Sequence, residues 1–156
     1  MAKKGGDKRL KRQLAPRFWQ VNRKSPRFIL NTMPGPHTRK LSYPIGVVLR
    51  DLLHVCSSIR EVKRSLNKGL ITVDGKMIHH PNFPVGLMDT VEIKPSKEYY
   101  RFVPSNGHPL LPIKINANEK NLKLGKIKSK VSSKKKSYQY CLHDGRTFLS
   151  AEAYNV

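Results

Sequence analysis

Positive charge is concentrated at the two ends of this chain, and the middle is almost neutral. Residues 1–40 contain twelve basic residues and one acidic residue, and residues 105–156 contain ten and three. Residues 41–104 contain nine and six. Because excess charge repels itself when a chain compacts, we expect a folded centre over 41–104, a basic N-terminal extension over 1–40, and a smaller unit over 105–156.

Composition excludes several classes of protein. The net charge is +21 and the hydrophobic fraction is 38%, whereas globular domains usually have about 45–50%. The longest purely apolar run, Ile45–Leu49, is far shorter than the roughly 20 residues of a membrane span. Met1–Leu14 is charged and lacks the apolar stretch of a secretory signal. We therefore expect a soluble intracellular protein whose partner is a polyanion, and no membrane partner.

The N-terminal extension is predicted to be a mainly extended arm, with a helical turn at Lys8–Leu14. Four prolines and a Gly-Gly pair interrupt it, and it has no sustained apolar period. Phe18 and Trp19 stand among arginines and lysines. Such aromatic residues can stack on RNA bases and can also pack on the protein's own core. The two interpretations are compatible, and the sequence leaves both open.

Two short helices are expected in the centre. Ser42 is a plausible N-cap for the first, with Pro44 in its first turn, and its buried face is Ile45, Val48, Leu49 and Leu52. The second helix begins with the capping-box pattern of Ser58 and Glu61. Its buried stripe is Ile59, Val62 and Leu66, and Gly69 is placed to end it.

The exposed side of the second helix is predicted to contact phosphates. At about 100° per residue, four cations lie beside the apolar stripe: Arg60, Lys63, Arg64 and Lys68. A solvated helix face is the common alternative. However, only Glu61 is near enough in sequence to pair with these cations, which favours an external anion.

Alternating patterns follow and predict small antiparallel sheets. Asp74-Gly75 is typical of a tight hairpin turn between Ile71–Val73 and Lys76–Ile78. Further strands are expected at Thr90–Ile93 and Tyr99–Val103, with a loop around Phe83 between Pro81 and Pro84 and a turn at Gly86–Asp89. The last segment suggests additional strands (Leu110–Ile115, Leu122–Leu124, Ile127–Val131, Tyr138–Leu142 and Thr147–Leu149), with a cationic hairpin tip at Lys134–Lys136. The fold class is therefore α+β. The lack of a closing strand before Val156 suggests that the last β unit is incomplete.

The sequence contains no recognisable catalytic, metal-binding or nucleotide-binding motif. Cys56 and Cys141 are far apart in sequence, so a zinc site is not expected. Neither a phosphate loop nor a G-x-G-x-x-G pattern occurs. We therefore predict no enzymatic activity, no cofactor, no metal and no small-molecule substrate, and we interpret Cys56 as a small buried apolar residue.

Several motifs resemble known RNA-binding proteins. Val47–Ile93, with the run Lys68–Lys76 and with Asp89, resembles the S4-type RNA-binding domain of bacterial ribosomal protein S4 and of several RNA-modifying enzymes. Lys11–Trp19 and Pro34–His37 are similar to the N-terminal signature of the archaeal and eukaryotic small-subunit ribosomal protein S4e family. Pro84–Asp89 and His143–Thr147 match that family further along the chain.

The resemblance implies a structural role in the small ribosomal subunit, in the cytoplasm. Members bind 16S/18S-type rRNA beside neighbouring ribosomal proteins and support subunit assembly and translation. It implies RNA contacts from Arg60, Lys63, Arg64, Lys68 and Lys76 in the S4-type domain, and from Lys8, Arg9, Lys11, Arg12, Arg17 and Trp19 in the arm. Members normally continue into a KOW-type β-barrel, to which nothing corresponds here, so the 105–156 domain is expected to be truncated. The alternatives are a general RNA-binding protein and an accessory module of an RNA-modifying enzyme.

Overall fold

The computed structural model describes residues 9–22, 24, 26–105, 107–132 and 137–154. The chain forms two compact units that divide between Leu122 and Lys123. The sequence instead predicted a boundary after Pro104. The difference arises because strands β8 (Glu98–Ser105) and β9 (His108–Ile115) form one antiparallel hairpin, which continues the central sheet past that point.

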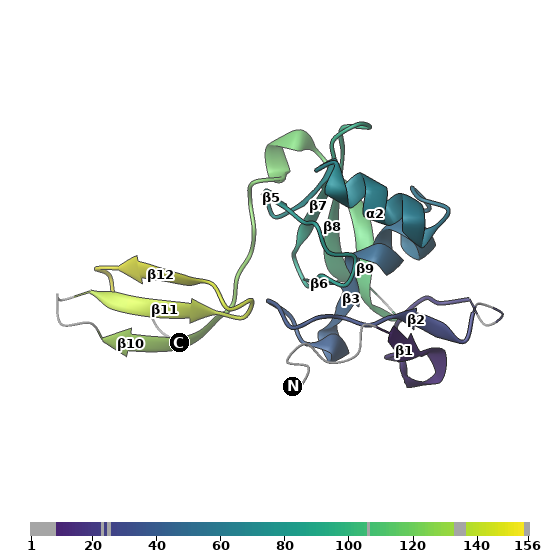
Figure 1. Ribbon diagram of the computed structural model, residues 1–156. Helices are drawn as coiled ribbons and strands as arrows, with labels where there is room; N and C mark the ends of the chain where they lie inside the picture. Colours follow the sequence, from purple (N-terminus) through teal and green to yellow (C-terminus); the bar gives the residue numbers. More distant parts are fainter. Residues whose placement is uncertain (1–8, 23, 25, 106, 133–136, 155–156) are drawn as a thin grey trace, which may run out of the picture. The chain divides into compact units, whose positions relative to one another are not determined.

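The first unit is built on a five-stranded antiparallel sheet in the order β5-β4-β7-β8-β9. Figure 1 labels β5, β7, β8 and β9 of this sheet. Its remaining strands are β4 (Ile71–Val73), β5 (Lys76–Met77) and β7 (Thr90–Ile93). Asp74 and Gly75, between β4 and β5, both have positive φ angles of 49° and 75°. These angles are what the predicted tight hairpin turn requires.

The helical residues come before this sheet in sequence and pack on it. A short helix α1 (Ile45–Val47) continues as a π-helical turn (Val48–Leu52), and α2 covers Ile59–Asn67. Val62 and Leu66 of α2 join Ile71 and Val91 of the sheet in one buried cluster. The predicted end of α2 is confirmed, since Gly69 has a φ of 66°.

The predicted cap of the first helix is wrong. Ser42 lies in strand β3 (Ser42–Pro44), which pairs with β6 (Pro84–Gly86), and the helix begins after Pro44 without a side-chain cap. The Ser42 hydroxyl instead donates to the Thr38 carbonyl at 2.8 Å. Pro84 accordingly belongs to a strand rather than to the predicted loop.

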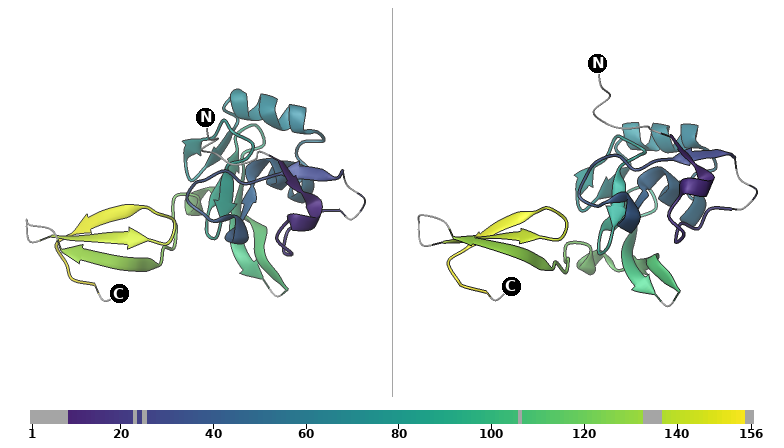
Figure 2. Two further views of the ribbon diagram at one scale, coloured as in Figure 1. Left: turned by 60° about the horizontal axis from the view of Figure 1, so that its bottom comes forward. Right: turned by 90° about the horizontal axis from the view of Figure 1, so that it is seen from below.

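The described residues between 9 and 40 pack on the core of the first unit instead of extending from it. Strands β1 (Arg9–Lys11) and β2 (Phe28–Leu30) pair antiparallel and lie side by side in every view (Figures 1 and 2). The predicted helical turn is reduced to one 3-10 turn at Arg12–Leu14, and another covers Arg39–Leu41. Leu10, Trp19 and Ile29 are buried in the main core cluster, so these scattered apolar residues fix the arm to the core.

The second unit is a three-stranded antiparallel sheet in the order β10-β11-β12. Its strands are Ile127–Ser132, Tyr138–Leu142 and Thr147–Ser150. Tyr140 is fully buried and stacks on Phe148, with ring centroids 5.1 Å apart. Leu122–Leu124 is not a strand, contrary to the prediction, and the Lys134–Lys136 tip lies outside the described residues. Ala117–Glu119, in the first unit, forms a 3-10 turn. Within the described residues, no helix is long and apolar enough to cross a membrane.

Candidate nucleic-acid interface

Local hydrogen bonds occupy the acidic residue of α2. The Ser58 hydroxyl accepts the Glu61 backbone N–H at 3.3 Å, which confirms the predicted cap. The Glu61 carboxylate accepts the Ser57 N–H at 2.8 Å and the Ser57 hydroxyl at 3.0 Å. The second half of the capping box therefore uses Ser57 and not Ser58. These hydrogen bonds from Ser57 lower the pKa of Glu61, so the carboxylate remains ionised and engaged at the start of the helix.

Four cations line the solvent side of α2. Arg60, Lys63, Arg64 and Lys68 are all exposed, and we refer to them as the α2 edge. Among the residues that the structure describes, none of the four forms an ion pair. Lys76, at the start of β5, is also exposed. The predicted cations are thus available to an external anion.

The arm presents further cations because its strands alternate. In β1, Leu10 faces the core while Arg9 and Lys11 are exposed. Lys11 pairs in register with Phe28 of β2. Arg17 is exposed, and Arg12 is half-buried, with Nη1 donating to the Asn22 carbonyl at 3.4 Å. Lys8 lies outside the described residues.

Trp19 is not available as a surface contact, which corrects its predicted role. Its side chain is 6% exposed, and its indole N–H donates to the Ser42 carbonyl at 2.9 Å. The ring stacks on Tyr43 with centroids 5.9 Å apart and an interplanar angle of 24°. Burial raises the pKa of Tyr43 to about 12. Of the two interpretations that the sequence left open for Trp19, packing on the core is the one found.

A groove lies between the arm and α2. It has a volume of about 470 Å³ and is lined on the arm side by Arg9 and Phe28–Leu30. Ile59 and Lys63 line it from α2, together with Arg50 and His80–Asn82. We call this the arm–helix groove. It places one predicted arm cation and one predicted helix cation in the same depression. Sequence reasoning missed Arg50 and Phe28, because no local pattern relates the arm to the helical region.

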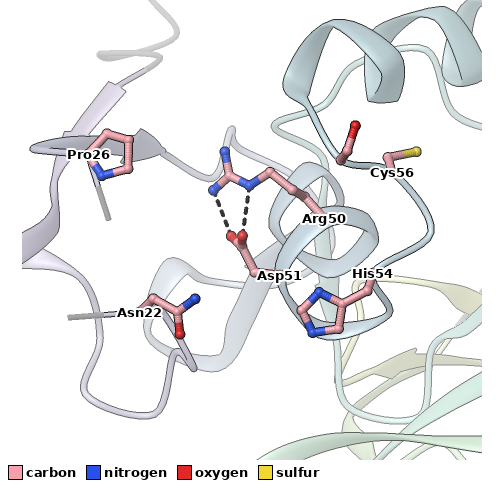
Figure 3. Close-up of a pocket in the computed structure, with 7 residues that line it drawn as sticks. Asn22, Pro26, Arg50, Asp51, His54 and Cys56 are labelled. Carbon is pink, nitrogen blue, oxygen red and sulfur yellow. Dashed lines mark hydrogen bonds and ion pairs between the residues drawn. The ribbon is translucent and has the colours of Figure 1, made fainter. Parts of the chain in front are cut away.

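A second pocket of about 550 Å³ lies beside the first and shares Arg50 (Figure 3). Arg50 donates from Nε and Nη2 to the two Asp51 carboxylate oxygens, both at 2.7 Å. The remaining lining comes from Asn22 and Pro26 of the arm and from His54, Cys56 and Ser57. Cys56 is buried, and burial raises the pKa of its thiol, which agrees with the predicted structural role. The carboxylate of Asp51 lines this second pocket, which is therefore less suited to an anion than the arm–helix groove.

Two short helical elements, an antiparallel hairpin and an exposed cationic helix edge form the arrangement expected of an S4-type domain. The S4 domain model matches residues 47–91, the RS4NT (NUC023) domain model matches residues 4–40, and the model of ribosomal family S4e matches residues 96–156. The chain is similar to proteins of ribosomal family S4e over most of its length.

Individual relatives show the same similarity. Small ribosomal subunit protein eS4 of Nanoarchaeum equitans is 45% identical over 151 residues, which is 96% of this chain and 64% of the relative. The protein of the same name from Caldivirga maquilingensis is 39% identical over 140 residues, 90% of this chain and 59% of the relative. The crystal structure of 30S ribosomal protein S4e from Thermoplasma acidophilum superposes with a TM-score of 0.58 at 35% identity, covering 72% of this chain and 56% of that chain. The chain therefore spans about three fifths of the length of the curated relatives it matches.

Proposed function

We propose that this chain is a structural constituent of the small ribosomal subunit that binds small-subunit rRNA and supports subunit assembly and translation. The observation that carries the proposal is the α2 edge, where four exposed cations have no carboxylate partner within the described residues. The names of the relatives place those proteins in the small ribosomal subunit. This chain would accordingly act in the cytoplasm, within the ribosome and beside neighbouring ribosomal proteins.

Phosphate contact is the physical basis of the proposed binding. Arginine and lysine side chains fix a protein on nucleic acid through the backbone, whereas base-edge contacts are needed only for reading sequence. Folded RNA is recognised largely by shape and by its backbone. Exposed cations on α2, at Lys76 and on β1 fit this mode, because they lie on elements held rigidly by a common core.

The catalytic alternative has little support. An RNA-modifying enzyme needs a reactive group in a dedicated site, and the matching family and the names of its members are ribosomal. The main alternative function is general polyanion binding, because a protein of that kind would use the same exposed cations without preference for one RNA.

A competition experiment tests the proposal. The full chain is mixed with labelled small-subunit rRNA and with increasing bulk RNA at matched salt, and co-sedimentation with the small subunit is measured after a high-salt wash. We expect preferential binding of the small-subunit rRNA and retention on the subunit. Equal affinity for both RNAs, with loss of the chain in the wash, would instead indicate a general polyanion binder.

A further inference from the structure

The arm–helix groove combines an exposed aromatic ring with cations, a pairing that suits an unstacked nucleotide. We propose that the groove holds one unpaired nucleotide of the bound RNA, with its base against the Phe28 ring and its phosphate beside Lys63 and Arg9. This inference rests on the proposed function, and it assigns a single nucleotide to the groove that Lys63 of the α2 edge shares with the arm.

The first argument is the position of Phe28. The two other aromatic residues of the arm are turned inward, since Trp19 is buried and Phe18 packs on Tyr43 with centroids 5.2 Å apart. Phe28 alternates with the buried Ile29 in β2 and is therefore turned outward, with 48% of its side chain exposed. The Arg27 guanidinium lies 5.6 Å from the ring centroid. An exposed ring among cations is the arrangement on which bases of single-stranded RNA stack.

The second argument is the opposite wall of the groove. Ile59 and Lys63 are one helical turn apart on α2 and both line the groove, because residues four apart share a helix face. Ile59 is half-buried and apolar, whereas Lys63 is exposed and charged. This wall therefore offers an apolar surface beside a phosphate-binding group. Arg50 adds a guanidinium that the two hydrogen bonds to Asp51 hold in a fixed orientation.

Size and charge select the occupant. The volume of about 470 Å³ lies within the range of roughly 300–1,000 Å³ found for small-molecule pockets. No acidic residue is among the described residues that line it. Asp51 pairs with the Arg50 guanidinium, so the phosphate is assigned to Arg9 and Lys63 and not to Arg50. A paired base stays within its stack and cannot enter, whereas bases of loops and bulges can turn outward onto aromatic side chains. These properties favour a bulged or looped nucleotide over a paired one.

The test compares two RNA hairpins that differ by one bulged uridine and whose strands are joined by a non-nucleotide linker, so that neither has loop nucleotides. Each is labelled with fluorescein and titrated with the full chain by fluorescence anisotropy. For Phe28→Ala we expect about a 5- to 150-fold weaker affinity for the bulged hairpin, from the loss of one stacked base, and less than a twofold change for the paired hairpin. Phe28→Trp should retain the preference for the bulge. Leu14→Ala, which alters an apolar side chain of the arm that is 65% exposed, is the matched control and should change neither affinity.

The salt dependence separates stacking from phosphate contact. Phe28→Ala removes no charge, so the slope of log K against log salt should be unchanged, whereas Lys63→Gln should reduce the slope by about 0.7–0.9. A 4-thiouridine at the bulge should crosslink to the peptide containing Phe28–Leu30. An unchanged thermal midpoint of Phe28→Ala would show that the variant is folded.

Each outcome decides the inference. Equal effects of Phe28→Ala on both hairpins, or a crosslink that maps elsewhere, would overturn it while leaving binding of small-subunit rRNA intact. Conversely, Phe28-dependent binding of the bulge without preference for small-subunit rRNA over bulk RNA would support the groove and contradict the proposed function. Competition by an oligoglutamate peptide with the same dependence on Phe28 would assign the groove to acidic proteins and would also overturn the inference.

Discussion

Replacing Trp19 with alanine should strongly lower the free energy of unfolding of the first unit, because Trp19 fixes the arm to the core. Its side chain is 6% exposed, it stacks on Tyr43, and its indole N–H donates to the Ser42 carbonyl at 2.9 Å. Truncating a buried tryptophan to alanine costs about 3–5 kcal/mol. Of this, the aromatic pair contributes about 0.5–1.5 kcal/mol, and the lost hydrogen bond contributes about 1 kcal/mol.

The assay is urea unfolding followed by far-ultraviolet circular dichroism, since Trp19 is the single tryptophan and its replacement removes the fluorescence signal. We expect Trp19→Ala to lower the free energy of unfolding of the first unit by about 3–5 kcal/mol. Trp19→Phe keeps most of the apolar area and should cost about 1–2 kcal/mol, mainly the lost hydrogen bond. Leu14→Ala in the same segment is 65% exposed and should stay within about 0.5 kcal/mol of the wild type.

Fluorescence of the wild type provides the complementary measurement. A buried indole should emit at short wavelength and resist quenching by acrylamide in the free protein, and its emission should not change when RNA is added. If Trp19→Ala were as stable as Leu14→Ala, and if RNA quenched the wild-type emission, the arm would be a free segment that docks on RNA, and the assignment of Trp19 to the core would be refuted.

Three other perturbations test the packing. Gly46→Ala should cost about 1–3 kcal/mol by overpacking, because a Cβ there would overlap the Leu30 side chain and would lie 3.1 Å from the Pro81 carbonyl oxygen. An unchanged thermal midpoint would contradict this close approach. Gly86→Ala should displace the His37 ring, which the new Cβ would overlap, and should accelerate amide exchange in residues 31–38. Equal exchange in variant and wild type would refute the contact. The free energy of unfolding should fall as the pH rises from about 10 towards 12. Burial raises the pKa of Tyr43 to about 12 in the folded state, so the unfolded state loses the Tyr43 proton first. Tyr43→Phe should flatten this decline, and an equally steep decline in that variant would exclude Tyr43 as its cause.

Local signals predicted the central unit well. The Ser58 cap, the positive φ of Gly69 and the Asp74-Gly75 hairpin are all set by residues within a few positions of one another. The cationic side of α2 also follows from helical periodicity, which fixes which residues face outward once Val62 and Leu66 are buried.

Contacts between distant segments were not predictable from local patterns. Leu10 pairs with Ile29 across the arm, and Trp19 contacts residues that follow it at a long sequence separation. The arm has no repeating pattern of apolar residues, because its apolar side chains pack singly on the core, each at a different point. The strand pairing of Ser42–Pro44 with Pro84–Gly86 is also a contact between distant segments. Local patterns did not predict it, because the prolines at both sites indicated turns or helix starts.

The sharpest test of the central claim is the salt dependence of rRNA binding after removal of three cations of the α2 edge. The variant Arg60→Gln/Arg64→Gln/Lys68→Gln is compared with Lys134→Gln/Lys135→Gln/Lys136→Gln, which removes the same charge from another part of the chain. The helix variant should reduce the slope of log K against log salt by about 2–3, corresponding to three lost phosphate contacts, and should weaken binding more than its counterpart. If the helix variant bound small-subunit rRNA with the wild-type affinity and slope, α2 would not be the surface that positions this protein on RNA.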